Sequence, residues 1–173
     1  MDDPIVPRSG SRLLLYGKWF NQNPAAPEGF PLAEMRSENF FRVNTLSSLF
    51  LNAEGGGSFG YKTGIPAFSL GGAQHLVAWG SNELLTDQYF LFQLGYIRKL
   101  ASLPPLLGDR LDFIGTYELG KTYRLPNGPK PPNLPTDFAA ALVAKTIFGP
   151  VEIGGAVGAY GRDRFFFQIG RVF

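Results

Sequence analysis

One short segment carries the residue pattern of a serine nucleophile. Residues 56–60, Gly-Gly-Ser-Phe-Gly, match G-x-S-x-G, the turn that presents a serine between a strand and a helix in hydrolases. The next residues, 61–66, contain a glycine and a proline and cannot open a helix, and His75 lies in the same loop. A G-x-G-x-x-G pattern over residues 55–60 fails as a dinucleotide motif for the same reason. We interpret the segment as a glycine-rich loop and keep a hydrolase using Ser58 as an alternative.

Two carboxylates, Asp112 and Glu118, fall on one face of a predicted strand, where they could serve as a general acid and base. We interpret each instead as a charge that faces the interior of a barrel and pairs with a basic side chain. His75 is the single histidine of the sequence, and the absence of cysteine excludes cysteine-ligated metals and disulfides. We therefore predict a non-enzymatic protein with no catalytic, metal or cofactor site.

The composition indicates a β-protein whose outside is not water. Charged residues make up 17% of the 173 residues, against about 25% in typical soluble domains. There are 16 phenylalanines, and Gly and Pro together number 36. A net charge of +2 without a basic cluster argues against a nucleic-acid partner. The acidic start, Met1-Asp2-Asp3-Pro4, is no signal peptide, so we expect a fragment of a longer precursor whose export signal lies upstream.

Period-two alternation predicts seven antiparallel strands and no membrane-spanning helix. The clearest is the last, where Phe165, Phe167 and Ile169 alternate with Arg164 and Gln168. The predicted strands are Arg12–Phe20, Phe40–Leu51, Tyr89–Arg98, Leu111–Lys121, the alanine-rich Phe138–Phe148, Val151–Tyr160 and Arg164–Phe173. The segments between them, Asn21–Pro31, Asn52–Asn82, Ala101–Asp109 and Pro126–Pro135, are predicted loops.

The two faces of these strands favour a membrane barrel over a soluble sandwich. A sandwich exposed to water shows dense charge on its outer face. Here one face is apolar with aromatic residues near the strand ends, and the other carries Gly, Gln, Thr and isolated charges. This distribution is typical of an aromatic girdle around a polar lumen. Gly154 and Gly158 fall on the polar face, where we expect their small size to leave space in the lumen.

Three segments, in their order and spacing, resemble the C-terminal part of the bacterial surface-antigen barrel superfamily. They are FSLGGAQHLVAWGSNEL at Phe68–Leu84 with the aromatic strand after it, Arg98–Pro104 with the strand from Leu111, and Thr146–Pro150 with the glycine-rich strand and RFFFQIGRVF at Arg164–Phe173. The superfamily includes outer-membrane assembly factors and two-partner secretion transporters. The sequence is most similar to the barrel of patatin-like phospholipase autotransporters, because Val77-Ala78-Trp79-Gly80 lacks the arginine typical of assembly factors.

The resemblance implies an all-β, antiparallel transmembrane β-barrel in the bacterial outer membrane, acting as an anchor or translocator. Residues 1–9 would be a linker and residues 10–173 an incomplete part of a sixteen-stranded barrel. Any phospholipase domain would lie upstream. The expected partners are outer-membrane lipid, the barrel-assembly machinery, and a secreted passenger domain or a second copy of the chain.

The resemblance also assigns residues. An infolded loop within residues 52–82 would enter the lumen through Gly71, Gly72, Val77, Trp79 and Gly80, and the lumen face would carry Gln93, Glu118, Lys145 and Glu152. The signal read by the assembly machinery would be Phe167, Gln168, Ile169, Gly170 and Phe173. The sequence is also compatible with a complete small eight-stranded outer-membrane barrel, and with a soluble β-sandwich or lipocalin-like ligand-binding protein.

Overall fold

The computed structural model describes residues 2–3, 5–21, 29–59, 66–73, 75–104, 106–123 and 132–170, and this part of the chain is all-β. Eight long strands form one antiparallel sheet in the order β1-β2-β3-β6-β7-β8-β9-β10, and two short strands pair separately. The strands are β1 (Gly10–Phe20), β2 (Phe30–Arg42), β3 (Ser47–Gly57), β4 (Phe68–Leu70), β5 (Leu84–Thr86), β6 (Gln88–Ser102), β7 (Arg110–Thr122), β8 (Thr136–Thr146), β9 (Gly149–Gly158) and β10 (Arg162–Ile169).

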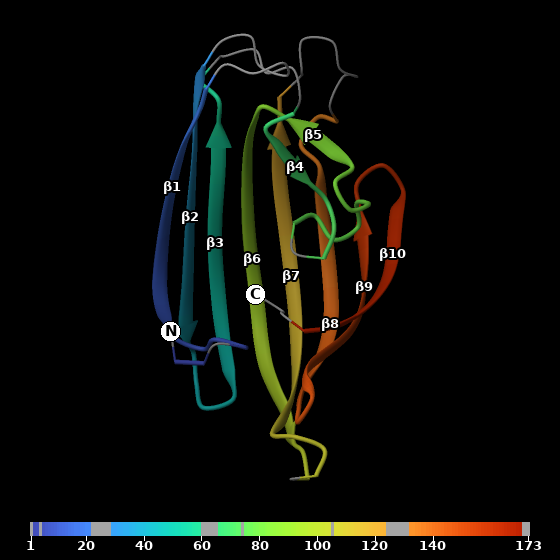
Figure 1. The fold of residues 1–173 in the computed structure, drawn as a ribbon. Coiled ribbons are helices and arrows are strands. Elements are labelled where there is room, and N and C mark those ends of the chain that lie inside the picture. Colours follow the sequence, from blue (N-terminus) through green and yellow to red (C-terminus); the bar gives the residue numbers. More distant parts are fainter. Residues whose placement is uncertain are drawn as a thin grey trace.

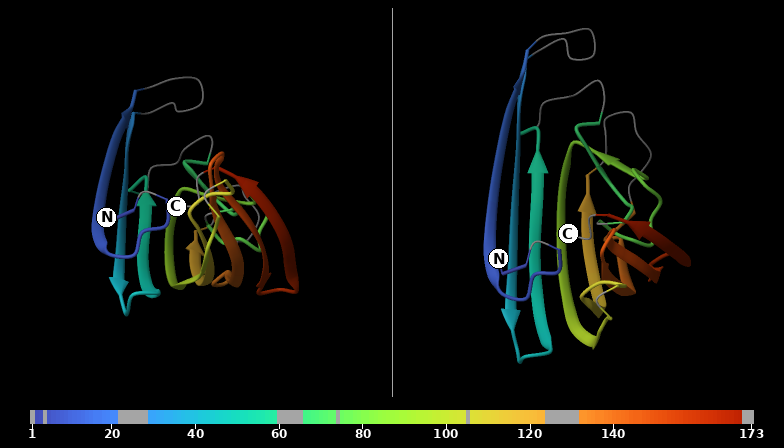
Figure 2. Two further views of the ribbon diagram at one scale, coloured as in Figure 1. Left: turned by 90° about the horizontal axis from the view of Figure 1, so that it is seen from below. Right: turned by 60° about the horizontal axis from the view of Figure 1, so that its bottom comes forward.

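The large sheet is curved, and the β4–β5 pair lies on its concave side (Figures 1 and 2). Within the described residues, β1 pairs only with β2 and β10 only with β9, so the sheet is open. The described residues contain no helix long and apolar enough to cross a membrane.

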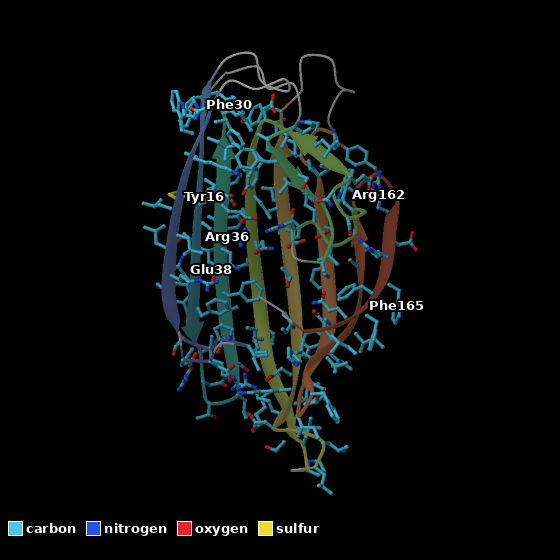
Figure 3. The ribbon with its side chains drawn as sticks, in the orientation of Figure 1. Tyr16, Phe30, Arg36, Glu38, Arg162 and Phe165 are labelled. Atoms are coloured by element: carbon cyan, nitrogen blue, oxygen red, sulfur yellow. The ribbon has the colours of Figure 1, made fainter. Side chains whose placement is uncertain are left out.

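The two faces of the sheet differ: the convex face is apolar, and the concave face combines charged side chains with apolar clusters. Large apolar side chains on the convex face are exposed, among them Leu15 (73%), Phe165 (73%) and Ile169 (65%), and Figure 3 shows Phe165 pointing away from the sheet. Six carboxylates are buried on the strands, each no more than 8% exposed: Glu38, Glu54, Asp112, Glu118, Asp137 and Glu152. A water-soluble sheet would place its charges on the outer face and keep large apolar side chains away from it.

The prediction of a single strand over Phe40–Leu51 is wrong. A turn at residues 43–46 divides this segment between β2 and β3, and the Asn44 side chain accepts hydrogen bonds from the backbone N–H groups of Leu46 (2.9 Å) and Ser47 (2.8 Å). The sheet therefore has eight long strands instead of seven. The two predicted loops that flank this segment, before β2 and after β3, are shorter than expected. The reason is that β2 already begins at Phe30 and β3 continues to Gly57.

Most of strand β2 was not predicted, because its concave face is charged and lacks the apolar residues expected of a buried face. Arg36 Nε lies 2.6 Å from Glu54 Oε2 on β3, and Arg12 Nη2 on β1 lies 2.6 Å from Glu38 Oε2. These ion pairs connect neighbouring strands, so the pattern of β2 alone does not reveal them. The prediction that the alanine-rich segment is a strand is confirmed by β8.

The segment before β1, which the sequence predicts to be a linker, packs against the concave face at the end of the sheet where β1 begins. Val6 is fully buried in an apolar cluster with residues that include Phe50 and Val143. Arg8 Nη2 lies 2.9 Å from Asp112 Oδ1, which is also buried. Arg110 donates a hydrogen bond to the carbonyl of Val6 at 2.9 Å. This inner layer joins the N-terminal segment to strands far away in sequence.

We expect Arg8→Ala to lower the free energy of unfolding by about 2–3 kcal/mol, because the buried Asp112 would lose one of its two arginine partners. Arg42→Ala is the matched control, because Arg42 pairs with Asp2 in an exposed position and should cost less than about 1 kcal/mol. Equilibrium urea denaturation measures both. Equal losses in the two variants would contradict the buried docking of the segment.

Candidate functional site

The candidate site is the contact between the concave face and the segment that connects β3 to β6, which we call the infolded segment (residues 66–73 and 75–87). It carries β4 and β5 and lies against the sheet at the end opposite the N-terminal segment (Figure 1). Its tip, Leu76 to Trp79, is no more than 7% exposed and packs in a cluster that also includes Leu91, Ala139 and Ala156 of the sheet. The tip is therefore part of the core of the protein.

Two buried carboxylates on adjacent strands hold the backbone of the tip. Val77 donates its N–H to Glu118 Oε2 at 2.9 Å, and Ala78 donates its N–H to Asp137 Oδ2 at 2.7 Å. Glu118 on β7 and Asp137 on β8 are register partners, and Gln93 on β6 donates a further hydrogen bond to Glu118. Consecutive amide groups in a tight turn have no backbone partners available, so buried carboxylates satisfy them.

Glycines on the wall make room for the infolded segment. A methyl group added at Gly158 would lie 2.8 Å from Cβ of Ala78, and one added at Gly120 would lie 2.8 Å from Cδ1 of Leu76. Such distances are shorter than carbon atoms tolerate. Of the two glycines expected to leave space inside, Gly158 lies where the infolded segment packs, whereas a methyl group at Gly154 would meet Phe166 and Ala141 of the neighbouring strands.

The tip is also attached to the last strand. The guanidinium of Arg162 lies 4.1 Å from the centroid of the Trp79 ring, and Tyr160 meets the same ring edge-on at 6.1 Å. Arg164 donates a hydrogen bond to the Trp79 carbonyl at 2.8 Å, and Arg162 donates one to Glu83 Oε2 at 2.8 Å. The infolded segment thus connects β7 and β8 to β10.

A third attachment lies on the other side of the infolded segment, toward β2 and β3. His75 Nε2 lies 2.8 Å from Glu54 Oε1, whose other oxygen is bound by Arg36. His75 therefore faces the sheet and binds a carboxylate there. Ser58 is fully buried, and its N–H bonds to the carbonyl of Asp87 at 3.1 Å. No cluster in the described residues could hold a metal ion.

A cavity of about 90 Å³ remains between the infolded segment and the wall. Its lining mixes acidic and apolar side chains, with Arg36 and His75 as basic members, and Figure 3 shows Arg36 and Glu38 close together along the same strand. The acidic side chains that line it are Glu38, Glu54, Glu118 and Glu152. The space between the segment and the sheet is thus small, with carboxylates set among apolar side chains.

The structure brings together most, but not all, of the residues that the sequence singles out. Val77 and Trp79 lie at the buried tip, and Gly71, Gly72 and Gly80 belong to the same infolded segment. Glu118 binds the tip directly, and Gln93 acts through Glu118. The remaining two predicted lumen residues do not bind the tip: Glu152 accepts from Gln168, and Lys145 donates to Asp3 at 3.3 Å.

The C-terminal residues separate by face. Phe167 and Ile169 are exposed on the convex face, whereas Gln168 points inward to Glu152. Gly170 has φ +119° and donates its N–H to the carbonyl of Pro150 at 2.9 Å, a conformation that suits glycine. Phe173 lies outside the described residues.

Sequence reasoning missed Asp137, Arg162 and Arg164. Asp137 stands one residue before the predicted strand at Phe138, so its place on the polar face went unnoticed. The i, i+2 spacing of Arg162 and Arg164, opposite Phe165, was a usable signal for two cations facing inward.

Comparison of the chain with protein-family models, with characterised proteins and with solved structures gives no match. Its function is therefore inferred from the geometry of the sheet and of the infolded segment.

We expect Gly158→Val to displace the tip at a cost of about 1–3 kcal/mol, because the added methyl groups would overlap Ala78. Hydrogen exchange at the amides of Val77 and Ala78 should become roughly tenfold faster or more. Gly155→Val on the same strand is the control, because Gly155 meets only the Arg164 carbonyl at 3.6 Å. Unchanged exchange in Gly158→Val would contradict the packing of the tip on β9.

Proposed function

We propose that this chain forms part of a bacterial outer-membrane β-barrel that serves as a membrane anchor or translocator, with the infolded segment occupying its lumen. The observation that carries the proposal is the outer face of the sheet, which exposes large apolar side chains while carboxylates are buried on the inner face. In water such a sheet would leave an extended apolar surface uncovered, whereas in lipid the same surface is stabilised.

The strand dimensions support this proposal. The eight long strands contain between 8 and 15 residues, and a tilted strand needs about 9–11 residues to cross the hydrocarbon core. Apolar residues occupy the convex face along the sheet, from β1 to β10. They include Leu13, Leu15 and Trp19 on β1, Leu94 on β6, Tyr117 on β7, Phe138 and Leu142 on β8, Ile153 and Val157 on β9, and Phe165, Phe167 and Ile169 on β10.

The connections support an orientation in the membrane. At one end of the sheet the turns are short, at residues 43–46, 103–109 and 147–148. At the other end, residues 21–29, 58–87 and 123–135 make longer connections, and the β9–β10 turn is short. Outer-membrane barrels have short periplasmic turns and longer extracellular loops. The infolded segment would then enter the lumen from the extracellular side, and the N-terminal segment would pack at the periplasmic end.

The polar concave face supports a lumen that is constricted rather than open. The infolded segment is attached at three places: to Glu118 and Asp137, to Arg162 and Arg164, and to Glu54 through His75. Lipid would contact the convex face, and the assembly machinery would read the last strand, β10. A passenger domain, if the chain carries one, would use this part as its anchor, which requires no enzymatic group in the barrel itself.

The eight-stranded complete barrel has one observation in its favour, the number of long strands. The open sheet and the occupied concave face count against it, because the interior of an eight-stranded barrel is just wide enough for side chains or one small ligand, whereas here a stretch of main chain lies inside. A soluble ligand-binding protein would have to keep the apolar convex face in water. We therefore favour a part of a wider barrel.

We expect Leu94→Lys to destabilise the protein in lipid by roughly 2–4 kcal/mol, because the charge would lie on the lipid-facing surface at the middle of β6. Leu107→Lys is the control, because Leu107 is similarly exposed but lies in a turn outside the strands. Urea unfolding from lipid vesicles measures both variants. Folding of the wild-type chain in water without detergent, with Leu94→Lys tolerated, would contradict the proposed function and favour a soluble protein.

A further inference from the structure

The two edges of the large sheet lack partners within the described residues. Strand β1 has β2 on one side only, and β10 has β9 on one side only. In lipid the free N–H and C=O groups of a strand edge have no water to bind, so spanning sheets must be closed. Under the proposed function, which this inference extends, both edges must therefore pair with further strands.

The two edges are poorly suited to pair with each other. The concave side holds main chain at both ends of the sheet: the tip of the infolded segment at one end and the N-terminal segment around Val6 at the other. Figure 2 shows the infolded segment inside the curve of the sheet, with β1 and β10 at opposite sides. The interior of an eight-stranded barrel is just wide enough for side chains or one small ligand. Closure around these segments needs more strands than the eight of the described sheet.

The edges are matched in direction and in the chemistry of their faces. As the first and eighth strands of an antiparallel sheet, β1 and β10 run in opposite directions. Rotation of a second copy about the barrel axis therefore places its β1 antiparallel to β10 of the first. Leu15 of β1 and Phe165 of β10 would share the lipid face, while Arg12 and Gln168 would share the lumen face.

We propose that a second copy of this chain closes the barrel, with β10 of each copy pairing with β1 of the other. The two seams are identical, and they close a symmetric ring with no free edge. The ring contains sixteen strands, an even number as in bacterial outer-membrane barrels, and its lumen accommodates both inner segments.

The absence of cysteine from the sequence makes a direct crosslinking test possible. One copy carries Leu15→Cys and one affinity tag, and the other carries Phe165→Cys and a second tag. The two are folded together into lipid vesicles and treated with a short bismaleimide, which tolerates small differences in strand register. We expect a crosslinked product with both tags and twice the 19.0 kDa mass of the chain. Replacing Leu15→Cys by Leu94→Cys, in the middle of the sheet, should abolish it.

Two results would overturn the second copy as the partner. A single chain carrying both Leu15→Cys and Phe165→Cys that crosslinks internally, with no mixed product, would indicate a self-closed barrel. Inserted protein with neither product would indicate that other strands occupy the edges. In both cases the chain still inserts into vesicles and Leu94→Lys still destabilises it, so the proposed membrane function would stand. Failure to insert at all would count against both proposals.

Discussion

Alternation of side chains along the strands divides this sheet into an apolar convex face and a polar concave face, and the other features depend on this division. Because the convex face is apolar and exposed, the charged groups must be satisfied on the concave side. They are satisfied by one another, as in Arg36 with Glu54, and by segments that enter the concavity, as in Arg8 with Asp112. The exposed apolar side chains and the ion pairs on the concave side are thus two consequences of the same alternation along the strands.

The infolded segment shows how a polar wall can hold a stretch of main chain. Glu118 and Asp137 accept from two successive amides, while glycines remove the side chains that would block close approach. Arg162 and Arg164 extend the attachment to the last strand. The position of the segment is therefore determined from several strands at once.

Local patterns predicted much of the fold and only part of the site. The strands β7 and β10 were predictable because alternation is contained within each strand. Strand β2 was not predictable, because the charges on its inner face are paired by Glu54 of β3 and Arg12 of β1, and the sequence of β2 alone does not show these partners. Asp137 was missed for a similar reason, since its partner, the amide of Ala78, lies 59 residues away. Contacts between distant segments leave no periodic signal in the sequence.

The position of the two tryptophans allows contact between the convex face and lipid to be measured directly. Trp19 is 63% exposed on the convex face, whereas Trp79 is 3% exposed inside the sheet. Single-tryptophan variants, Trp79→Phe and Trp19→Phe, are folded into vesicles whose lipids carry bromine on their acyl chains, which quenches indole fluorescence on contact. An outer face that meets lipid predicts strong quenching of Trp19 and little quenching of Trp79. Equal quenching of the two, or none for Trp19, would contradict a lipid-facing convex face.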